Sequence, residues 1–299
     1  MEFFRNIDVY LNTGGNYYKL RVSSVAFNQT FKQKSTKQKT LHNSSSLIEG
    51  SEINEANPAQ FEMDLLMVDE SSTYQHIPLQ LLLTNNGDTL SSFNLYIDPS
   101  TVSDTSRKMY LLNTCVLESG SFNISRNSIM SLSLSGSASK LSRVAYSTFD
   151  IGSFDTTPTY SIPKVVTVTV ANTVLDRVTG ISLEVQNEVS WTKNNTLQNS
   201  LVALTATNST YPTSFSMKGR TVAGNITTYV DAQASDLQTW KENISVRIQA
   251  GLASNNTQLD ANLTPCSFTN RLDPTEVFTQ GYDFRMIGSP TNLNTLFTY

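Results

Sequence analysis

The segment MSLSLS, residues 130–135, decides the fold, because apolar and polar side chains alternate through it without a break. The same alternation runs through Val25–Lys32 and through Phe61–Met67. Successive side chains of a β-strand point to opposite faces of the sheet, so a period of two predicts strands with one apolar and one wet face. Antiparallel sheets can be covered on one side only, so these segments predict a mainly β protein built from such sheets.

Helices are expected to be few and short. The segment HIPLQLLL, residues 76–83, predicts one helix with Pro78 in its first turn and Asn86-Gly87 after its end. A strand is the alternative interpretation, and Pro78 weakens it. A second short helix is predicted from Ser235 to Asn243, where Ser235 can act as the N-cap.

The composition supports strands and argues against long surface helices. Of the 299 residues, 38% are hydrophobic and only 15% are charged, and Ser, Thr and Asn make up the difference. Such residues suit strands with polar outer faces joined by turns, whereas surface helices rely on Glu, Lys and Arg. The net charge of -4 argues against nucleic-acid binding over the general surface, because a bound duplex requires a basic stripe.

Cysteine usage and the N-terminal sequence indicate a reducing compartment. Cys115 and Cys266 lie far apart and are expected to be buried thiols. The N-terminal MEFFRNIDVY has no long apolar core typical of a signal peptide, and no run approaches the ~18 apolar residues of a membrane span. We therefore expect a product made in a cytoplasm, with no membrane partner.

The two halves of the chain resemble each other in the order of their elements. Each half has two alternating strands, then the predicted helix, then a Cys-containing strand and a final strand that reaches a glycine. The Cys-to-Gly spacings are similar, at 21 (115 to 136) and 22 (266 to 288). The paired segments are 25–31 with 183–189, 61–67 with 222–230, 113–117 with 264–268, and 132–137 with 284–289.

Any two β-rich halves can be aligned by eye, but the shared order and the matched spacing favour a duplication. Two copies of one fold are expected to occupy equivalent places in a ring. The predicted domains are residues 1–150 and 164–299. The segment 151–163, with its scattered Gly and Pro, is the predicted linker.

No pattern typical of catalysis is present. Neither His42 nor His76 has a metal-ligand partner at helical spacing, and there is no nucleophile elbow, phosphate loop or dinucleotide fingerprint. Acidic residues such as Glu62, Asp64 and Glu184 are candidates for the two catalytic carboxylates of a glycosidase. Acids two apart on a strand are normally just solvated. The sequence therefore predicts a protein that is not an enzyme and has no cofactor and no metal.

One charge cluster follows a predicted strand directly. Residues 32–39 read KQKSTKQK, and three acids follow at Glu49, Glu52 and Glu55. The cluster could be a patch that binds a polyanion. Alternatively, it forms a strand extension and hairpin tip that meets acids on a neighbouring subunit, with plain solvation as a third possibility.

Two segments are similar to strands of phage tail tube proteins. Residues 109–124, MYLLNTCVLESGSFNI, resemble the third inner strand and turn of that family, and residues 132–141, LSLSGSASKL, resemble its fourth strand. The early strand, the polar loop Thr40–Asn57 and the strand Phe61–Met67 are similar to the family's first hairpin. The chain resembles the two-domain kind of major tail tube protein found in some long-tailed bacteriophages (siphophages).

This resemblance implies two tandem tail-tube folds, each a β-sandwich or half-barrel with a flanking short helix. Three such chains would form a homotrimeric ring that is hexameric in outline and closes a β-barrel around a channel. The rings would stack into a tube for genome delivery in the virion tail. The implied partners are other copies of the chain, the tail tip, tape measure and tail terminator proteins, and double-stranded DNA in transit without specific binding.

The polar phase of each inner strand is then the predicted lumen wall. These lumen residues are Asn28, Thr30, Lys32, Glu62, Asp64, Ser131, Ser133, Glu184, Gln186, Glu188, Asn225, Thr227 and Asp283. Acids outnumber bases in this set, which would repel DNA weakly and let it slide. The predicted contacts between stacked rings are Lys32, Lys34, Lys37, Lys39, Glu49, Glu52 and Glu55.

Other classes of protein remain as alternatives. A phage or secreted β-sandwich that binds carbohydrate or a receptor would be expected to cluster aromatic residues on an exposed face. Trp191 and Trp240 instead fall within the repeated elements. A β-rich hydrolase is disfavoured by the lack of catalytic patterns, and single-copy tubes of contractile tails are disfavoured by the repeat.

Overall fold

A computed structural model describes residues 6–39, 47–67, 76–86, 89–99, 106–125, 128–151, 165–192, 211–230, 240–253, 256–273, 279–288 and 297–298. Strands dominate these residues, which confirms the mainly β prediction. The elements of the first half are β1 (Asp8–Thr13), β2 (Asn16–Leu20), β3 (Val22–Asn28), β4 (Phe31–Lys39), β5 (Leu47–Ala56), β6 (Ala59–Leu66), α1 (His76–Leu83), β7 (Asn85–Asn86), β8 (Thr89–Leu90), β9 (Phe93–Asp98), β10 (Lys108–Ser125) and β11 (Ser131–Ala145).

The elements of the second half are strands throughout the described residues. They are β12 (Val165–Val170), β13 (Thr173–Val174), β14 (Val178–Thr192), β15 (Ser214–Tyr229), β16 (Trp240–Ala253), β17 (Asn256–Asp273), β18 (Thr279–Met286) and β19 (Phe297–Thr298). The predicted linker and the predicted domain boundaries fall largely on residues outside the described ranges.

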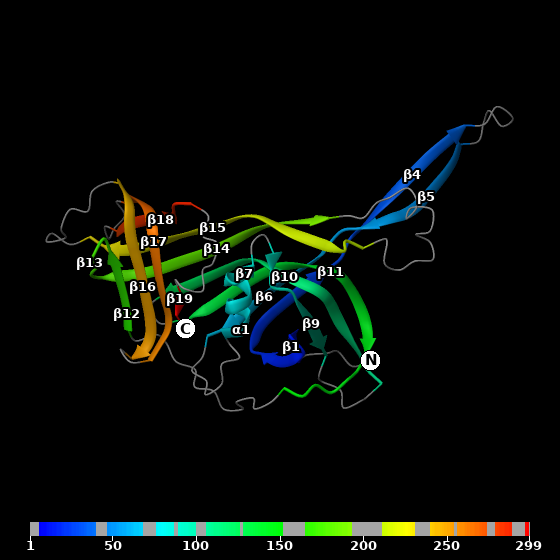
Figure 1. The fold of residues 1–299 in the computed structure, drawn as a ribbon, viewed down its shortest axis with the longest axis horizontal. Helices are drawn as coiled ribbons and strands as arrows, with labels where there is room; N and C mark the ends of the chain where they lie inside the picture. The colour runs from blue at the N-terminus through cyan, green and yellow to red at the C-terminus, as the bar shows by residue number, and fades with distance from the viewer. Residues whose placement is uncertain are drawn as a thin grey trace.

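One antiparallel sheet runs through both halves. Its central run of eight neighbouring described strands is β3-β6-β11-β10-β14-β15-β18-β17. In the first half β9 pairs with β10 and β1, and β1 pairs with β2; in the second half β16 pairs with β17 and β12, and β12 pairs with β13. The second half therefore repeats the strand order of the first, and β14 continues the sheet where β10 ends the first four strands (Figure 1).

The strand registers align the two halves residue by residue. The row Leu117–Gly136–Phe61–Phe27 in the first half corresponds to the row Phe268–Phe284–Gly224–Leu183 in the second. Both halves have a register shift at the same place, after Val22 in β3 and after Val178 in β14.

Two side-chain hydrogen bonds also recur at equivalent positions. At the register shift, the Ser23 hydroxyl donates to the Asp64 carbonyl at 3.3 Å, and the Thr179 hydroxyl donates to the Thr227 carbonyl at 3.1 Å. Each cysteine thiol likewise faces the carbonyl three residues before it. Repeated small details of this kind strengthen the case for a duplication.

These registers correct two details of the sequence alignment. Gly136 lies inside β11 opposite Leu117, whereas Gly288 lies beyond the end of β18, so the matched Cys-to-Gly spacing does not join equivalent residues. Phe27 is equivalent to Leu183, so the pairing of 25–31 with 183–189 is displaced by two residues. A period of two permits this slip, because a shift by two residues keeps every side chain on its own face.

The apolar phase of the central strands forms the core. Strand β6 alternates buried and wetter positions along its whole length, with Phe61, Met63 and Leu65 inside. Residues of β1, β9 and α1 cover this face in the first half, among them the fully buried Val9, Leu95 and Leu82. The opposite face of the central run is left without such a layer in the described part of the chain.

The first predicted helix is confirmed, and the second is wrong in part. Helix α1 spans His76–Leu83 and lies against β10, where Gly120 makes room for the side chain of Leu82. Of the predicted second helix, residues 235–239 lie outside the described residues, and Trp240–Asn243 belong to β16. Pairing with β17 fixes this segment as a strand, because tertiary pairing overrides a weak local helix preference.

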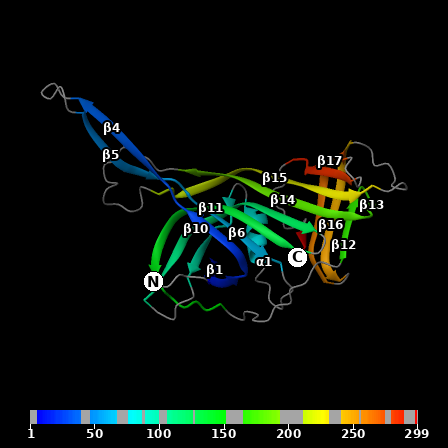
Figure 2. The ribbon, with the colours of Figure 1, turned by 180° about the vertical axis from the view of Figure 1, so that it is seen from behind.

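Strands β4 and β5 pair with each other, so residues 47–56 form a strand where the sequence predicted a polar loop. Strands β4 and β5 pair only with each other among the described strands, and together they project away from the rest of the molecule (Figures 1 and 2). The sequence LIEGSEINEA of β5 has no sustained alternation of apolar and polar residues, so the sequence offered no period of two from which to predict this strand.

Candidate functional site: the polar face of the central sheet

The uncovered face of the central run is polar across both halves. One row crosses it as Ser24–Asp64–Ser133–Ser121–Glu184–Ala223–Arg285–Ser267, and a neighbouring row contains Ser131, Asn123, Ser182, Asn225, Asp283 and Thr269. The rows cross from β10 to β14 without interruption. A single hydroxyl-, amide- and carboxylate-rich surface therefore spans both copies of the repeat.

Hydrogen bonds between neighbouring strands hold the acids of this face in place. The Ser24 hydroxyl donates to Asp64 Oδ2 at 2.6 Å, and this bond, followed by one from Ser133, lowers the pKa of Asp64. In the second half, Asn225 Nδ2 donates to Asp283 Oδ1 at 2.7 Å. A carboxylate that accepts hydrogen bonds stays ionised more readily, so Asp64 keeps its negative charge on this face.

The predicted lumen residues fall into two groups. Eleven of them lie on the central sheet with side chains in the polar phase: Asn28, Glu62, Asp64, Ser131, Ser133, Glu184, Gln186, Glu188, Asn225, Thr227 and Asp283. Thr30 lies between β3 and β4, and Lys32 lies on β4 of the projecting hairpin, where its ammonium is 3.7 Å from a carboxylate oxygen of Glu55. The structure thus brings one set together and separates these two residues from it.

Sequence reasoning missed several members of the polar face. Ser119, Ser121 and Asn123 of β10 belong to it, as do Arg271 and Arg285 of the second half. The alternation in β10 is broken by a register shift between Leu117 and Ser119, which leaves Glu118 as an extra residue and hides the polar phase. The two arginines reduce the acidic excess of the face but do not reverse it.

A buried polar cluster joins the two halves behind this face. Arg220 and Asn187 of the second half are only 5% and 3% exposed. Arg220 Nε donates to Asn187 Oδ1 at 2.6 Å, and its other nitrogens donate to the carbonyls of Leu82 and Leu83 at 3.1 Å. These carbonyls end α1, so the guanidinium caps a helix C-terminus with a positive charge.

Asn187 completes the link to β10, since its Nδ2 donates to the Leu117 carbonyl at 3.0 Å and to the Leu82 carbonyl at 3.2 Å. Burial lowers the pKa of Arg220 to about 10, so the side chain stays charged at neutral pH. A buried charge is tolerated when hydrogen bonds surround it. The cluster therefore fixes α1 and β10 of the first half against β14 and β15 of the second.

A second polar network lies at the same junction. Trp191 Nε1 of β14 donates to the Ser137 hydroxyl of β11 at 2.7 Å, and Ser137 in turn donates to Glu118. Burial raises the pKa of Glu118, although the bond from Ser137 offsets part of that effect. Trp191 also packs against Phe215, so it serves the junction and not an exposed aromatic platform.

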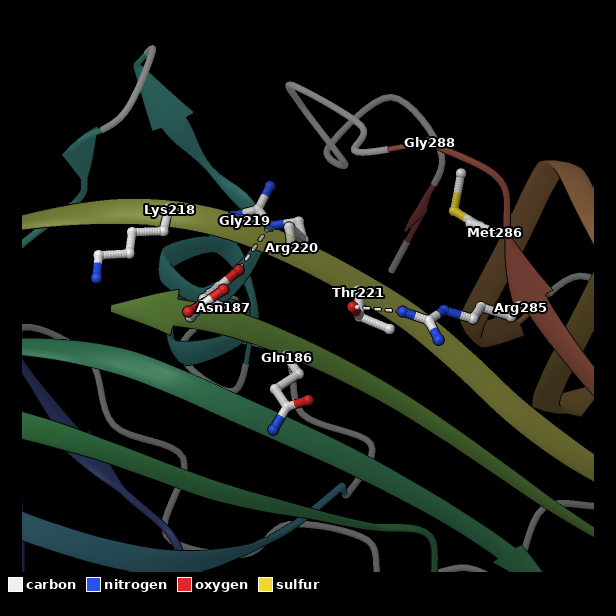
Figure 3. A pocket seen from close by; sticks show the side chains of 10 residues that line it. Gln186, Asn187, Lys218, Gly219, Arg220, Thr221, Arg285, Met286 and Gly288 are labelled. Atoms are coloured by element: carbon white, nitrogen blue, oxygen red, sulfur yellow. Dashed lines mark hydrogen bonds between the residues drawn. The ribbon is translucent and has the colours of Figure 1, made fainter. Parts of the chain in front are cut away.

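A hollow with a volume of about 650 Å³ lies between β14, β15 and β18 (Figure 3). Lys218, Glu188 and Arg285 line it, and Arg285 Nη2 is 3.4 Å from the Thr221 hydroxyl. The described residues contain no group of three or more His, Cys, Asp or Glu side chains that could hold a metal ion. Asn187 and Arg220 also line the hollow, so it connects charged side chains of the polar face with the buried cluster.

The predicted contacts between rings lie on the hairpin. Its register places Lys32 opposite Glu55, Lys34 opposite Glu52 and Lys37 opposite Glu49, so the basic strand pairs with the acidic one within the same chain. Opposite charges across a strand pair stabilise it. Lys32 and Glu55 form an ion pair inside the subunit, and contacts between these charges and a neighbouring ring stay a prediction.

Both cysteines are fully buried and reduced, as expected. Burial raises the pKa of Cys115 and raises that of Cys266 to about 11, so both thiols are unreactive. Among the described residues, no helix has the length and apolar character needed to cross a membrane.

Two comparisons with known proteins gave different outcomes. A search of the curated proteins found no match. The model of the Bacteriophage Baseplate Tube Protein Family matches residues 3–298, nearly the whole chain. A structural role in a phage tail agrees with a large β-sheet whose residues include no catalytic pattern. The chain belongs to the Bacteriophage Baseplate Tube Protein Family, and it is a structural component of the phage tail and baseplate and not an enzyme.

Proposed function

We propose that three copies of this chain form a ring, and that rings stack into the baseplate section of the tail tube. The observation that supports this proposal is the continuous polar face across eight strands of both halves. Each copy of the repeat would supply one sixth of the wall, so a trimer would be hexameric in outline. In a long-tailed phage such rings would continue the channel through which the genome leaves.

The polar face would line the channel. Its serines, threonines and amides would hold a layer of water, and its acids, including Glu62, Asp64 and Glu184, would repel the phosphates weakly. A basic wall would instead bind DNA and slow its passage. Under this proposal the DNA is a transient partner, and no residue recognises its base sequence.

The projecting hairpin β4–β5 would contact the next ring. It lies outside the central sheet and is paired only with itself among the described strands, so it can reach along the tube axis without disturbing the wall. Residues 32–39 and 49–55 would form this contact. Other proteins of the tail tip, the tape measure protein and a terminator would meet the ends of the stack.

Electron microscopy of the purified chain at high concentration tests the proposal. We expect rings or short tubes with a sixfold outline and the mass of three chains in each ring. A three-dimensional reconstruction should have Glu62, Asp64 and Glu184 on the channel surface. A stable monomer that forms no rings even with tail-initiation proteins present, or a channel lined by the opposite face, would overturn it.

A further inference from the structure

The junction between the two halves is a template for contact with a second copy. Within the chain, β10 ends the first set of four strands, and its residues 119–125 pair with 180–186 of β14, which begins the second set. By the repeat, β17 is the equivalent of β10, and β3 is the equivalent of β14. These two strands are the ends of the eight-strand central run.

The burial of β3 indicates that a neighbour belongs beside it. Val25 and Phe27 are half-buried, whereas their equivalents Ile181 and Leu183 in β14 are 4% and 0% exposed. The difference follows from neighbours, because β14 has a strand on each side and β3 pairs only with β6 among the described strands. A second strand along β3 would bury its apolar side chains as β10 buries those of β14.

The other end of the run offers the matching strand. Pairing between β16 and β17 reaches Thr269, while pairing between β17 and β18 continues to Asp273. Residues 270–273 of β17 therefore extend past the described part of β16, as residues 119–125 of β10 extend past β9.

The registers give the pairing residue by residue. The row Ser121–Ser133–Asp64–Ser24 corresponds to the row Arg271–Gly281–Thr227–Gly180. Ser121 is therefore the equivalent of Arg271, and Glu184, which lies opposite Ser121, is the equivalent of Asn28. We infer that β17 pairs antiparallel with β3 of a second copy, with Arg271 opposite Asn28 and Leu272 opposite Phe27.

This inference rests on the proposed ring, and it specifies the seam that closes it. The seam differs from the in-chain junction in its chemistry. The positions equivalent to the buried Asn187 and Arg220 are Phe31, which is 46% exposed, and Asn57. The seam between copies would thus bury the aromatic side chain of Phe31 where the junction within the chain buries the Asn187 amide, and it would have the neutral Asn57 in place of the buried charge of Arg220. Because the junction within a chain and the seam between copies differ in chemistry, first and second halves are favoured to alternate around the ring.

Disulfide crosslinking of the full-length chain tests the register. Asn28 and Arg271 are both exposed on the polar face, and directly opposite residues of an antiparallel pair have Cα atoms about 4.5–5.5 Å apart, within disulfide range. Under mild oxidation, N28C/R271C should give covalent dimers and trimers that reductant reverses, with no larger species. An equimolar mixture of N28C and R271C should give dimers only. The buried Cys115 and Cys266 can remain.

The matched control moves one cysteine along the same face. Ala26 is exposed and would lie opposite Asp273, so A26C/R271C places the thiols diagonally, about 7–8 Å apart at Cα, and should crosslink at least tenfold more slowly. Rings seen by microscopy without crosslinks in N28C/R271C, or with equally fast crosslinking in A26C/R271C, would overturn the register and leave the ring intact. The absence of any ring in the unmodified chain would overturn the proposed function instead.

Discussion

The first and second halves of the chain share a backbone plan but place their large side chains differently. In the first half, Phe61 on β6 lies opposite Gly136 on β11; in the second half, Gly224 on β15 lies opposite Phe284 on β18. Each glycine leaves room for the ring beside it. The two middle strands of this row thus supply one phenylalanine and one glycine in both copies, with the two residues exchanged between strands.

This exchange shows what the fold requires at that row. A packed interior constrains the total side-chain volume at a row strictly. It constrains less strictly which of the neighbouring strands carries the large side chain. The halves also differ where they meet, because α1 of the first half accepts hydrogen bonds from Arg220 of the second. They differ again at the extra residue Glu118 of β10, since β17 pairs with β18 without a register shift.

The largest expected effect concerns the buried arginine at the junction. Arg220→Met would leave the Asn187 side chain and the last carbonyls of α1 without their charged donor. We expect the free energy of unfolding to fall by about 2–4 kcal/mol, because buried acceptors would lose hydrogen bonds to a charged group. Urea denaturation measures the loss.

Lys218→Met on the same strand is the control, because Lys218 is exposed, and it should cost less than about 0.5 kcal/mol. Equal losses for the two variants would mean that the cluster does not hold the halves together.

The next effect tests the exchanged glycines. Gly136→Ala would bring a methyl group into the Val116 carbonyl and the Phe61 ring, and Gly224→Ala would bring one into the Ser182 carbonyl and the Phe284 ring. Each substitution should cost about 1–3 kcal/mol, since overpacking forces neighbours to shift. Thermal or urea unfolding gives the two values, which should agree within about 1 kcal/mol.

Gly219→Ala provides the comparison, because its nearest neighbour would be Glu188 Oε2 at 3.7 Å, an ordinary contact. If one of the two exchanged glycines tolerated alanine as well as Gly219 does, the two rows would not be equivalent.

The smallest effects depend on pH, and the first of them concerns Glu118 in the first half. Burial raises the folded-state pKa of Glu118 above its ordinary value of 4.5. The folded protein therefore holds this proton more tightly than the unfolded chain does. The resulting contribution to stability is complete below the ordinary pKa and is lost as pH rises through the folded-state pKa. Glu118→Gln should therefore raise stability at pH 7 relative to the parent, with the difference shrinking toward pH 4.

Asp260→Asn should have the opposite sign. Hydrogen bonds from Arg247 lower the pKa of Asp260, so its stabilising effect is present above its ordinary pKa, and the variant should be less stable at pH 7. Urea unfolding at several pH values compares both variants. A gain at pH 7 from Asp260→Asn, or none from Glu118→Gln, would contradict these assignments.

The sequence alone determined the class of the protein and most of the polar face. Alternation in segments such as Phe61–Met67 and 130–135 has one physical meaning, so the strands and their wet sides could be predicted. The helix at His76–Leu83 also followed from local signals, and the absence of catalytic patterns agreed with a structural family. The order of elements revealed the two similar halves.

Only the tertiary structure decided the registers, the hairpin and the junction. A slip by two residues leaves the pattern unchanged, so the alignment of Gln29 with Asn187 and of Gly136 with Gly288 could not be tested from the sequence. Strand β5 and the start of β16 take their form from the strand beside them, because hydrogen bonding to a partner outweighs weak local preferences. Arg220 reads as one more exposed charge in the sequence; burial beneath α1, more than a hundred residues away in the chain, makes it the link between the halves.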